Sequence, residues 1–191
     1  MMNEYFSQTV IPTPIVDWKS LWPEILSSDD PGIDLPLFRL INTKSVTLHD
    51  LWSEGDVADK LKDAGIEPYF IRIFRWRPNR FFSWHIDGVV NKPRFCALNW
   101  VLEGYGEIQW NTKYDWGEKT NKINAFKNRF GNYDDPYEES ANGNACLVNT
   151  LIPHRLVNMN STHRVTISIL ANEKLSYAEV YHRLASVQLL L

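Results

Sequence analysis

The chain has little cysteine, with only Cys96 and Cys146 among its 191 residues. Two thiols are too few for a disulfide framework or a four-thiolate zinc site, so a reducing compartment is the simpler expectation. The sequence also lacks the run of about 18 apolar residues that a membrane-spanning helix needs. The first residues have neither the basic start nor the apolar core of a secretory signal peptide. We therefore expect a cytoplasmic protein that does not bind membranes.

The chain also lacks a large excess of either positive or negative charge. The chain has 20 Lys and Arg against 23 Asp and Glu, a formal net charge of −3. This balance argues against binding to nucleic acid through net charge. Arginines do alternate with aromatic residues in 70–82, a pattern that suits single-stranded nucleic acid. In a strand, however, that alternation divides the arginines between two faces. A nucleic-acid partner is disfavoured but stays open.

Aromatic residues, in contrast, are abundant, with eight Trp and 13% Phe, Trp and Tyr. The content of 44% hydrophobic and 23% charged residues is ordinary for a globular protein. A chain of this length fits one domain with a well-buried core. The aromatic residues suit either a large, stiff core or an aromatic-lined pocket, and composition does not choose between the two.

The pattern along the chain predicts a single domain, 1–191, in three parts. Frequent prolines in 11–40 predict an extended arm with a short helix at 17–26. Helical spacing of apolar residues predicts a second helix at 56–64 and a third in 173–191. The expected parts are an N-terminal arm with helices, a β core and a C-terminal helix: 1–66, 67–172 and 173–191.

Between the predicted helices the hydrophobic period changes to two, and short aromatic and β-branched runs are separated by turn residues. These runs predict strands at 69–76, 81–86, 95–102, 107–110, 145–149, 154–158 and 164–170. Many short strands without alternating helices favour a mainly β barrel or sandwich. The polar stretch 111–143 interrupts the core, and an insertion of this length is typical of a lid or binding loop.

His85 and Asp87 are two residues apart at the end of the predicted strand 81–86. Side chains at this spacing point to the same side of a strand, so both can bind one ion. His154 starts another predicted strand and supplies a third ligand. Two imidazoles and a carboxylate on one face of a metal leave the opposite positions open, as in non-haem Fe(II) oxygenases.

Arg164 lies ten residues after His154 in an otherwise apolar strand, and Thr166 points to the same side. A buried guanidinium needs an anionic partner. A dicarboxylate would satisfy Arg164 and Thr166 with one end while its other end chelates the metal.

These residues together resemble the Fe(II)/2-oxoglutarate-dependent dioxygenase superfamily. The order His85-x-Asp87, His154 and Arg164 carries the resemblance, and the run 75–87 is similar to that of the prolyl-hydroxylase-like branch. The resemblance covers roughly 69–170 apart from the polar insertion. It implies a double-stranded β-helix, the jelly roll or cupin-like barrel, with flanking helices at the N-terminal side and the C-terminus.

The resemblance implies that Fe(II) is bound by His85, Asp87 and His154, and that the cosubstrate 2-oxoglutarate is bound by Arg164 and Thr166. The expected reaction is hydroxylation of a substrate with release of succinate and CO2. Trp76 stands where many relatives have a tyrosine that hydrogen-bonds the cosubstrate, and an indole N–H can also donate such a bond. Arg164 replaces the lysine of the prolyl hydroxylases themselves, so collagen-type hydroxylation is not implied.

Four further residues are candidates near the site. Asn99 either hydrogen-bonds the cosubstrate or is a satisfied buried amide. Arg94 either binds an anionic group of the substrate or is a solvated turn residue. Trp100 and Trp110 are expected to close over the substrate. That substrate is a small molecule or an amino-acid side chain, and the sequence predicts neither its identity nor the oligomeric state.

Two alternatives stay open. One is a cupin-like metal-dependent isomerase or hydrolase that uses the same three ligands without a cosubstrate and does not require Arg164. The other is a non-catalytic relative in which an aromatic pocket holds a ligand.

Overall fold

The computed structural model describes most of the chain outside a few segments. The described residues are 2–15, 37–41, 47–82, 84–89, 92–93, 95–111, 134–140, 143–171 and 175–191. The helix expected at 17–26, the candidate Arg94 and most of the polar insertion 111–143 lie outside them. The described part of that insertion, 134–140, forms a strand and not the predicted loop.

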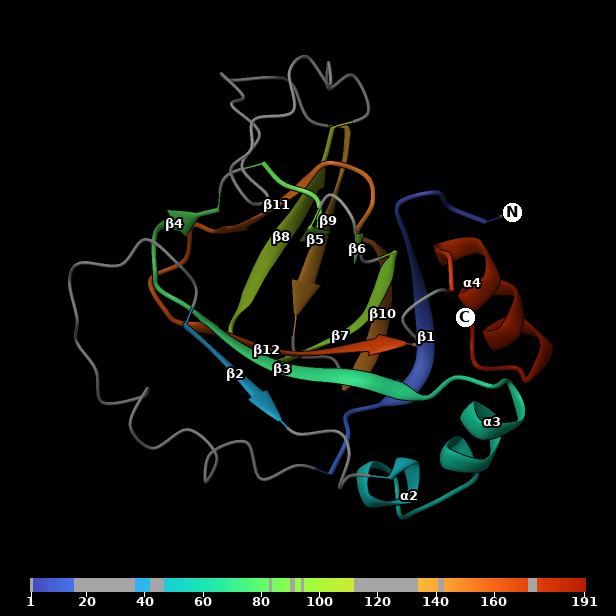
Figure 1. The fold of residues 1–191 in the computed structure, drawn as a ribbon. Helices are drawn as coiled ribbons and strands as arrows, with labels where there is room; N and C mark the ends of the chain where they lie inside the picture. The colour runs from blue at the N-terminus through green and yellow to red at the C-terminus, as the bar shows by residue number, and fades with distance from the viewer. Residues whose placement is uncertain are drawn as a thin grey trace.

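The described chain is mainly β and forms two large antiparallel sheets (Figure 1). The six-stranded sheet has the order β1 (Phe6–Pro12), β10 (Asn144–Asn149), β7 (Cys96–Glu103), β12 (Arg164–Ala171), β3 (Pro68–Trp76) and β2 (Leu37–Ile41). The four-stranded sheet has the order β4 (Arg80–Phe81), β11 (His154–Asn158), β8 (Tyr105–Trp110) and β9 (Asp134–Ser140). Strand β5 (Gly88–Val89) pairs antiparallel with β6 (Lys92–Pro93) in a separate two-stranded sheet.

The pairing of eight of these strands defines the architecture. Strand β3 pairs with β12, β4 with β11, β7 with β10 and β8 with β9, all antiparallel. The first strand of the eight thus pairs with the last, the second with the seventh, and so on inward. This is the pattern of an antiparallel ribbon folded in half and coiled into a jelly roll. The structure confirms the predicted double-stranded β-helix.

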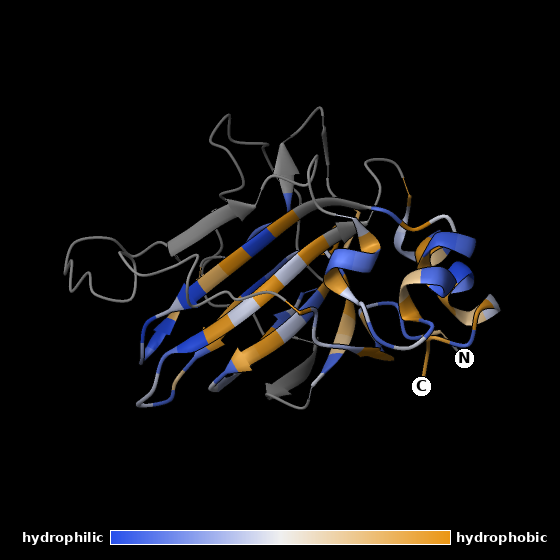
Figure 2. Ribbon diagram, turned by 90° about the horizontal axis from the view of Figure 1, so that it is seen from below, coloured by the Kyte–Doolittle hydropathy of each residue, from blue (hydrophilic) through white to orange (hydrophobic). Residues whose placement is uncertain are grey.

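Strand alternation gives the six-stranded sheet two different faces. On one face Ile167 lies opposite Ile73, and Ile169 lies opposite Ile71. These fully or nearly fully buried side chains form the main hydrophobic core, together with residues of the helices. Figure 2 shows hydrophobic and hydrophilic residues alternating along the strands. The opposite face points toward the four-stranded sheet, and it carries the polar residues described below.

Helices cover the first of these faces. They are α2 (Leu48–Leu51), α3 (Val57–Asp63) and α4 (Tyr177–Ser186). Ser176 and Glu179 form a reciprocal capping box that fixes the start of α4. The helices predicted at 56–64 and 173–191 are therefore present within those ranges. No helix in the described part of the chain is long and apolar enough to cross a membrane.

The N-terminal segment adds a strand that the sequence analysis does not identify. Strand β1 pairs with β10, so that Phe6 lies opposite Val148 and Gln8 opposite Cys146. It also contacts the chain end, where the Val10 N–H donates to the Leu189 carbonyl over 3.1 Å. Figure 1 shows β1 at the edge of the six-stranded sheet, between β10 and α4. The N-terminal segment thus closes one side of the β-helix.

Candidate metal centre

Backbone pairing places the two candidate histidines side by side. His85 follows β4, and His154 is the first residue of β11. The His85 N–H donates to the His154 carbonyl over 3.0 Å, and the His154 N–H donates back over 2.8 Å. As a result the two imidazole ring centroids are 4.4 Å apart. A two-residue bridge between neighbouring strands therefore brings together ligands that are far apart in sequence.

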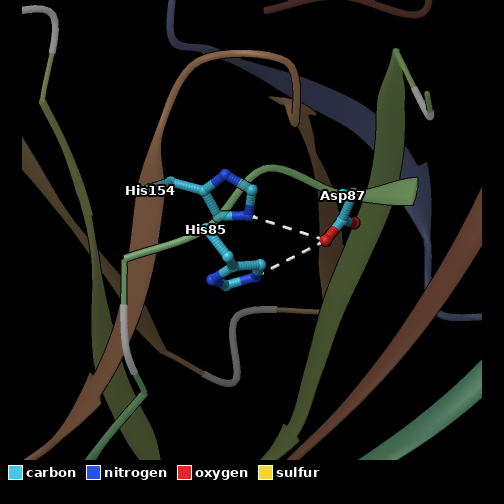
Figure 3. A group of neighbouring side chains, drawn as sticks. All are labelled: His85, Asp87 and His154. Carbon is cyan, nitrogen blue, oxygen red and sulfur yellow. Dashed lines mark ion pairs between the residues drawn. The ribbon is translucent and has the colours of Figure 1, made fainter. Parts of the chain in front are cut away.

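Asp87 completes the group (Figure 3). Its backbone N–H donates to the Thr150 carbonyl over 3.1 Å, which anchors the segment after His85 against the end of β10. Its Oδ1 lies 3.5 Å from His85 Nε2 and 4.0 Å from His154 Nε2. The three ligand atoms all lie within 4.8 Å of one another. The structure thus brings together the three residues that the sequence predicts as metal ligands.

The protonation of the group suits a metal. The Nδ1 of His154 lies 2.9 Å from the Ile152 carbonyl, to which it donates when Nε2 carries the lone pair. Burial and the neighbouring His85 lower the pKa of His154 to about 4, so this imidazole is neutral at pH 7. Burial tends to raise the pKa of Asp87, but His85, His154 and Arg72 together lower it. Neutral imidazole with carboxylate is a donor set for divalent transition metals.

Rings and a cation pack around the segment that carries His85. On one side the Phe82 ring meets the His85 ring edge-on, with centroids 4.6 Å apart, and Trp76 packs against Phe82. The neighbouring Trp84 is buried, and the Arg155 guanidinium lies 4.7 Å from its ring centroid. The Phe82 ring thus restrains the His85 imidazole, and the contact between Arg155 and Trp84 restrains the backbone next to His85.

Arg164 is buried on the face of β12 that points toward the four-stranded sheet, with a relative exposure of 2%. Its side chain passes Gly106 of β8, because a Cβ at Gly106 would lie 2.8 Å from Arg164 Cδ and 2.7 Å from the Val157 carbonyl. Gly106 therefore provides the space that the arginine side chain needs. Burial lowers the pKa of Arg164 to about 10, so the guanidinium stays charged at pH 7.

Two buried polar atoms lie on the same face as Arg164. Trp76 is directly opposite Arg164 in the β3–β12 register, and Thr166 is two residues along β12. Trp76 Nε1 and Thr166 Oγ1 are buried and have no hydrogen-bond partner among the described residues. Such atoms are rare in folded proteins and call for an explanation. The structure thus brings together three of the four residues predicted to bind a cosubstrate.

The fourth, Asn99, lies on the same face of β7, opposite Ser168 of β12. Its Oδ1 atom is also buried without a hydrogen-bond partner in the described part of the chain. Although this oxygen atom is buried, the Asn99 residue as a whole is half-buried. It is separated from Arg164 by the rung that contains Thr166 and Val101.

The two tryptophans predicted to contact substrate are placed differently. Trp110 lies opposite His154 in the β8–β11 register. It is fully buried, stacks with Phe6 at a ring-centroid distance of 5.6 Å, and donates from Nε1 to the Asn149 carbonyl over 3.3 Å. Trp110 is a packing residue beside the metal ligands, held by the N-terminal segment.

Trp100 is not brought to the metal ligands. It faces the helices, packs against Trp52 and donates from Nε1 to the Ile11 carbonyl over 3.1 Å. Its neighbour Asn99 faces the other way, as strand alternation requires. We therefore do not include Trp100 in the proposed site.

Trp100→Phe is expected to lower the free energy of unfolding by about 1–3 kcal/mol, because it removes a buried hydrogen bond and leaves space in the core. Metal affinity is expected to stay within about twofold of wild type, since sites without shared partners act independently. Urea unfolding and a metal titration measure the two quantities. A large loss of metal affinity with unchanged stability would contradict the placement of Trp100 in the core.

Two further residues near the site were not identified by sequence reasoning. Gly106 lacks any local signal, because its function depends on a side chain from another sheet. Arg72 faces the same way as Trp76, four residues along β3, and is half-buried. Counting back from Trp76 in steps of two would have placed Arg72 on this face.

Comparisons with known proteins give fold likeness alone. No protein-family model and no curated protein matches the chain. Among solved structures, a cupin domain from Bordetella pertussis Tohama I is 9% identical with a TM-score of 0.36, covering 56% of this chain and 81% of that one. Lactobacillus farciminis oxalate decarboxylase is 11% identical with a TM-score of 0.41, covering 75% and 31%.

Peruvianin-I, a cysteine peptidase from Thevetia peruviana latex, is 13% identical with a TM-score of 0.36, covering 55% of this chain and 51% of that one. The chain thus spans about half or less of two of these three proteins. TM-scores at this level assign no activity. The strand pairing of this chain itself defines its fold class, a cupin-like double-stranded β-helix, whose interior groups two histidines and an aspartate that could hold a metal ion.

Proposed function

We propose that this protein is an Fe(II)- and 2-oxoglutarate-dependent dioxygenase that hydroxylates its substrate with release of succinate and CO2. The observation that supports this function is the buried cation Arg164, on the same interior face as the polar atoms of Trp76 and Thr166. A metal site alone does not require these three residues. A keto acid with a second carboxylate accounts for both the metal ligands and the Arg164 group. Its keto acid end chelates the metal, and its second carboxylate binds the Arg164 cation.

The residues fit both the metal and the cosubstrate. His85, Asp87 and His154 would hold Fe(II) through two neutral nitrogens and one carboxylate oxygen. Arg164 would pair with the distal carboxylate of 2-oxoglutarate, and Thr166 Oγ1 and Trp76 Nε1 would donate to it. When bound, iron and 2-oxoglutarate together supply the activation of dioxygen that oxidises a C–H bond.

The protein's own contribution is binding, orientation and exclusion of water. Burial of Arg164 places its charge in a medium of low effective dielectric, where its attraction for a carboxylate is stronger than in water. Its passage beside Gly106 fixes the direction from which the guanidinium is presented. The His154 bond to the Ile152 carbonyl fixes the tautomer of one ligand. The cosubstrate is thereby held in one orientation relative to the metal ligands.

An anaerobic titration followed by visible absorption tests this function. Fe(II) is added to the metal-free protein, and 2-oxoglutarate follows. We expect a weak charge-transfer band that needs both additions. Two control compounds test the two ends of the cosubstrate separately. Succinate lacks the keto group and should give no band. 2-Oxobutyrate lacks the distal carboxylate and should give the band only at much higher concentration.

The other outcomes contradict the proposal. Metal binding without any band would favour a cupin-like metal enzyme that uses no cosubstrate. Failure to bind any divalent metal would favour a protein that binds a ligand without catalysis.

Trp76→Phe is expected to lower the stability of the ligand-free protein less than Trp100→Phe does, because both changes leave space but Trp76 Nε1 has no hydrogen-bond partner among the described residues. The same change should weaken 2-oxoglutarate binding by about tenfold, the value of one hydrogen bond to a charged group. Unfolding in urea and the band titration measure the two effects. Trp100→Phe is the matched control, since it should lower stability and leave cosubstrate binding unchanged.

A further inference from the structure

A second polar row crosses the interior face of the six-stranded sheet. Ser168 of β12 lies opposite Arg72 of β3 on one side and opposite Asn99 of β7 on the other. All three residues are half-buried, whereas Arg164 and Thr166 are almost fully buried. The row is therefore in contact with solvent, while the Arg164 group lies deeper in the β-helix.

The row lies toward the end of the β-helix that carries the metal ligands. Asp87 is anchored to Thr150, and the Thr150 N–H donates to the carbonyl of Phe95, which precedes the first residue of β7. Asn99 is the fourth residue of β7, whereas Arg164 and Trp76 are aligned with the opposite end of the sheet. Burial lowers the pKa of Arg72 and the Asp87 charge opposes this shift, while the Arg72 charge helps to lower the pKa of Asp87. The guanidinium is thus within electrostatic reach of a metal ligand.

The proposed cosubstrate does not use this row. Its distal carboxylate is assigned to Arg164, and its keto acid end is assigned to the metal. Arg72 offers a cation with planar, directed donors, which suits a carboxylate. Ser168 offers a hydroxyl beside it. Asn99 Oδ1 is a buried acceptor without a partner in the described chain, so it can accept a bond from a ligand N–H or O–H.

We propose that Arg72, Ser168 and Asn99 bind the carboxylate end of the primary substrate. The substrate class is a small organic acid whose carboxylate lies near the carbon that is oxidised, with a hydrogen-bond donor beside it. This inference rests on the proposed function, since that function assigns Arg164 to the cosubstrate and leaves Arg72 for the substrate. Arg72 then determines specificity, because an uncharged analogue lacks the charge that the guanidinium attracts.

Ligand-observed NMR tests this assignment with propionate and its neutral counterpart propionamide as probes. The protein is loaded with Zn(II), which has no redox chemistry, and saturated with 2-oxoglutarate so that Arg164 is occupied. We expect propionate to bind and propionamide to bind much more weakly. Arg72→Gln should weaken propionate binding by about tenfold or more. Ser168→Ala should weaken it less, because it removes one uncharged partner, and Asn99→Ala should leave it unchanged, because propionate has no N–H or O–H to donate to Asn99 Oδ1.

Arg75→Gln is the matched control. Arg75 is on the same strand but points to the opposite face, where its guanidinium lies 3.0 Å from His163 Nε2. This variant should bind propionate as wild type does. Absence of propionate binding in wild type, or equal binding of propionamide, would overturn the assignment. So would an Arg72→Gln variant that loses metal affinity but keeps propionate binding, since Arg72 would then serve only Asp87.

The test also separates this inference from the proposed function. If the protein binds metal but not 2-oxoglutarate, the dioxygenase proposal fails by itself. The probe titration is then repeated without cosubstrate in an Arg164→Gln background, which removes the deeper cation. Propionate binding that depends on Arg72 in that background supports the carboxylate site, and binding that does not depend on Arg72 overturns it.

Discussion

Arg164→Gln is expected to leave metal binding intact and to weaken 2-oxoglutarate binding by about 30-fold or more. Removing one partner of a buried, hydrogen-bonded charge pair costs about 2–5 kcal/mol, and each 1.4 kcal/mol is about a factor of ten in affinity. Arg164 is 2% exposed, so solvent screens the pair little. Calorimetric titration of the Zn(II)-loaded variant with 2-oxoglutarate measures the loss.

Two further variants make the result specific. Arg164→Lys keeps a cation but loses the planar fork, so we expect an intermediate affinity. Arg75→Gln is the control, because Arg75 lies on the opposite face of β3 with its guanidinium 3.0 Å from His163 Nε2, and cosubstrate affinity should not change. A folded Arg164→Gln protein with full affinity for 2-oxoglutarate would remove the main support for the proposed function.

Gly106→Ala tests the same contact from the other sheet. The new Cβ would lie 2.7 Å from the Val157 carbonyl and 2.8 Å from Arg164 Cδ. The arginine side chain must move, and we expect cosubstrate affinity to fall by about tenfold while metal affinity is retained. Unchanged cosubstrate affinity in a variant of normal stability would show that Arg164 is not held by this contact.

Much of the site could be predicted from local pattern. The period of two in the strands is enough to place Arg164 and Thr166 on one side. The strand predicted at 81–86 is wrong beyond Phe81, and His85 and Asp87 are instead positioned by the bridge to His154 and the bond to Thr150. The same rule also shows why Trp100 is not at the site. Asn99 and Trp100 are adjacent in β7, so one faces the interior and the other faces the helices. Applied strictly, alternation allows only one of them as a site residue.

Other features of the site depend on contacts between segments that are distant in sequence, and no local sequence pattern indicates them. Trp110 is fully buried because Tyr5 and Phe6 pack on its ring, and these residues lie at the far end of the sequence. Gly106 matters because the Arg164 side chain crosses from the other sheet. The short bridge between His85 and His154 likewise sets the ring spacing only once β4 and β11 have paired. Such contacts follow from the topology, which periodicity does not supply.

Asp87→Asn is expected to weaken divalent-metal binding by more than about 100-fold, beyond the range typical of residues that only orient a ligand. The carboxylate is the single anionic ligand of the group, and its low pKa keeps it charged at neutral pH. A metal present at about 1,000 times its dissociation constant stabilises the folded state by about 4 kcal/mol. The wild-type melting temperature should therefore rise with added metal, and that of the variant should not.

The metal-free variant should fold normally, because the Asp87 contact that anchors the chain uses its backbone N–H, which asparagine keeps. His163→Gln is the matched control, since His163 contacts Arg75 on the opposite face and should leave the metal effect intact. A metal-dependent rise in melting temperature that survives Asp87→Asn would place the ion elsewhere. Because Arg164 and Arg72 are both assigned relative to this ion, that outcome would remove the cosubstrate and substrate assignments together.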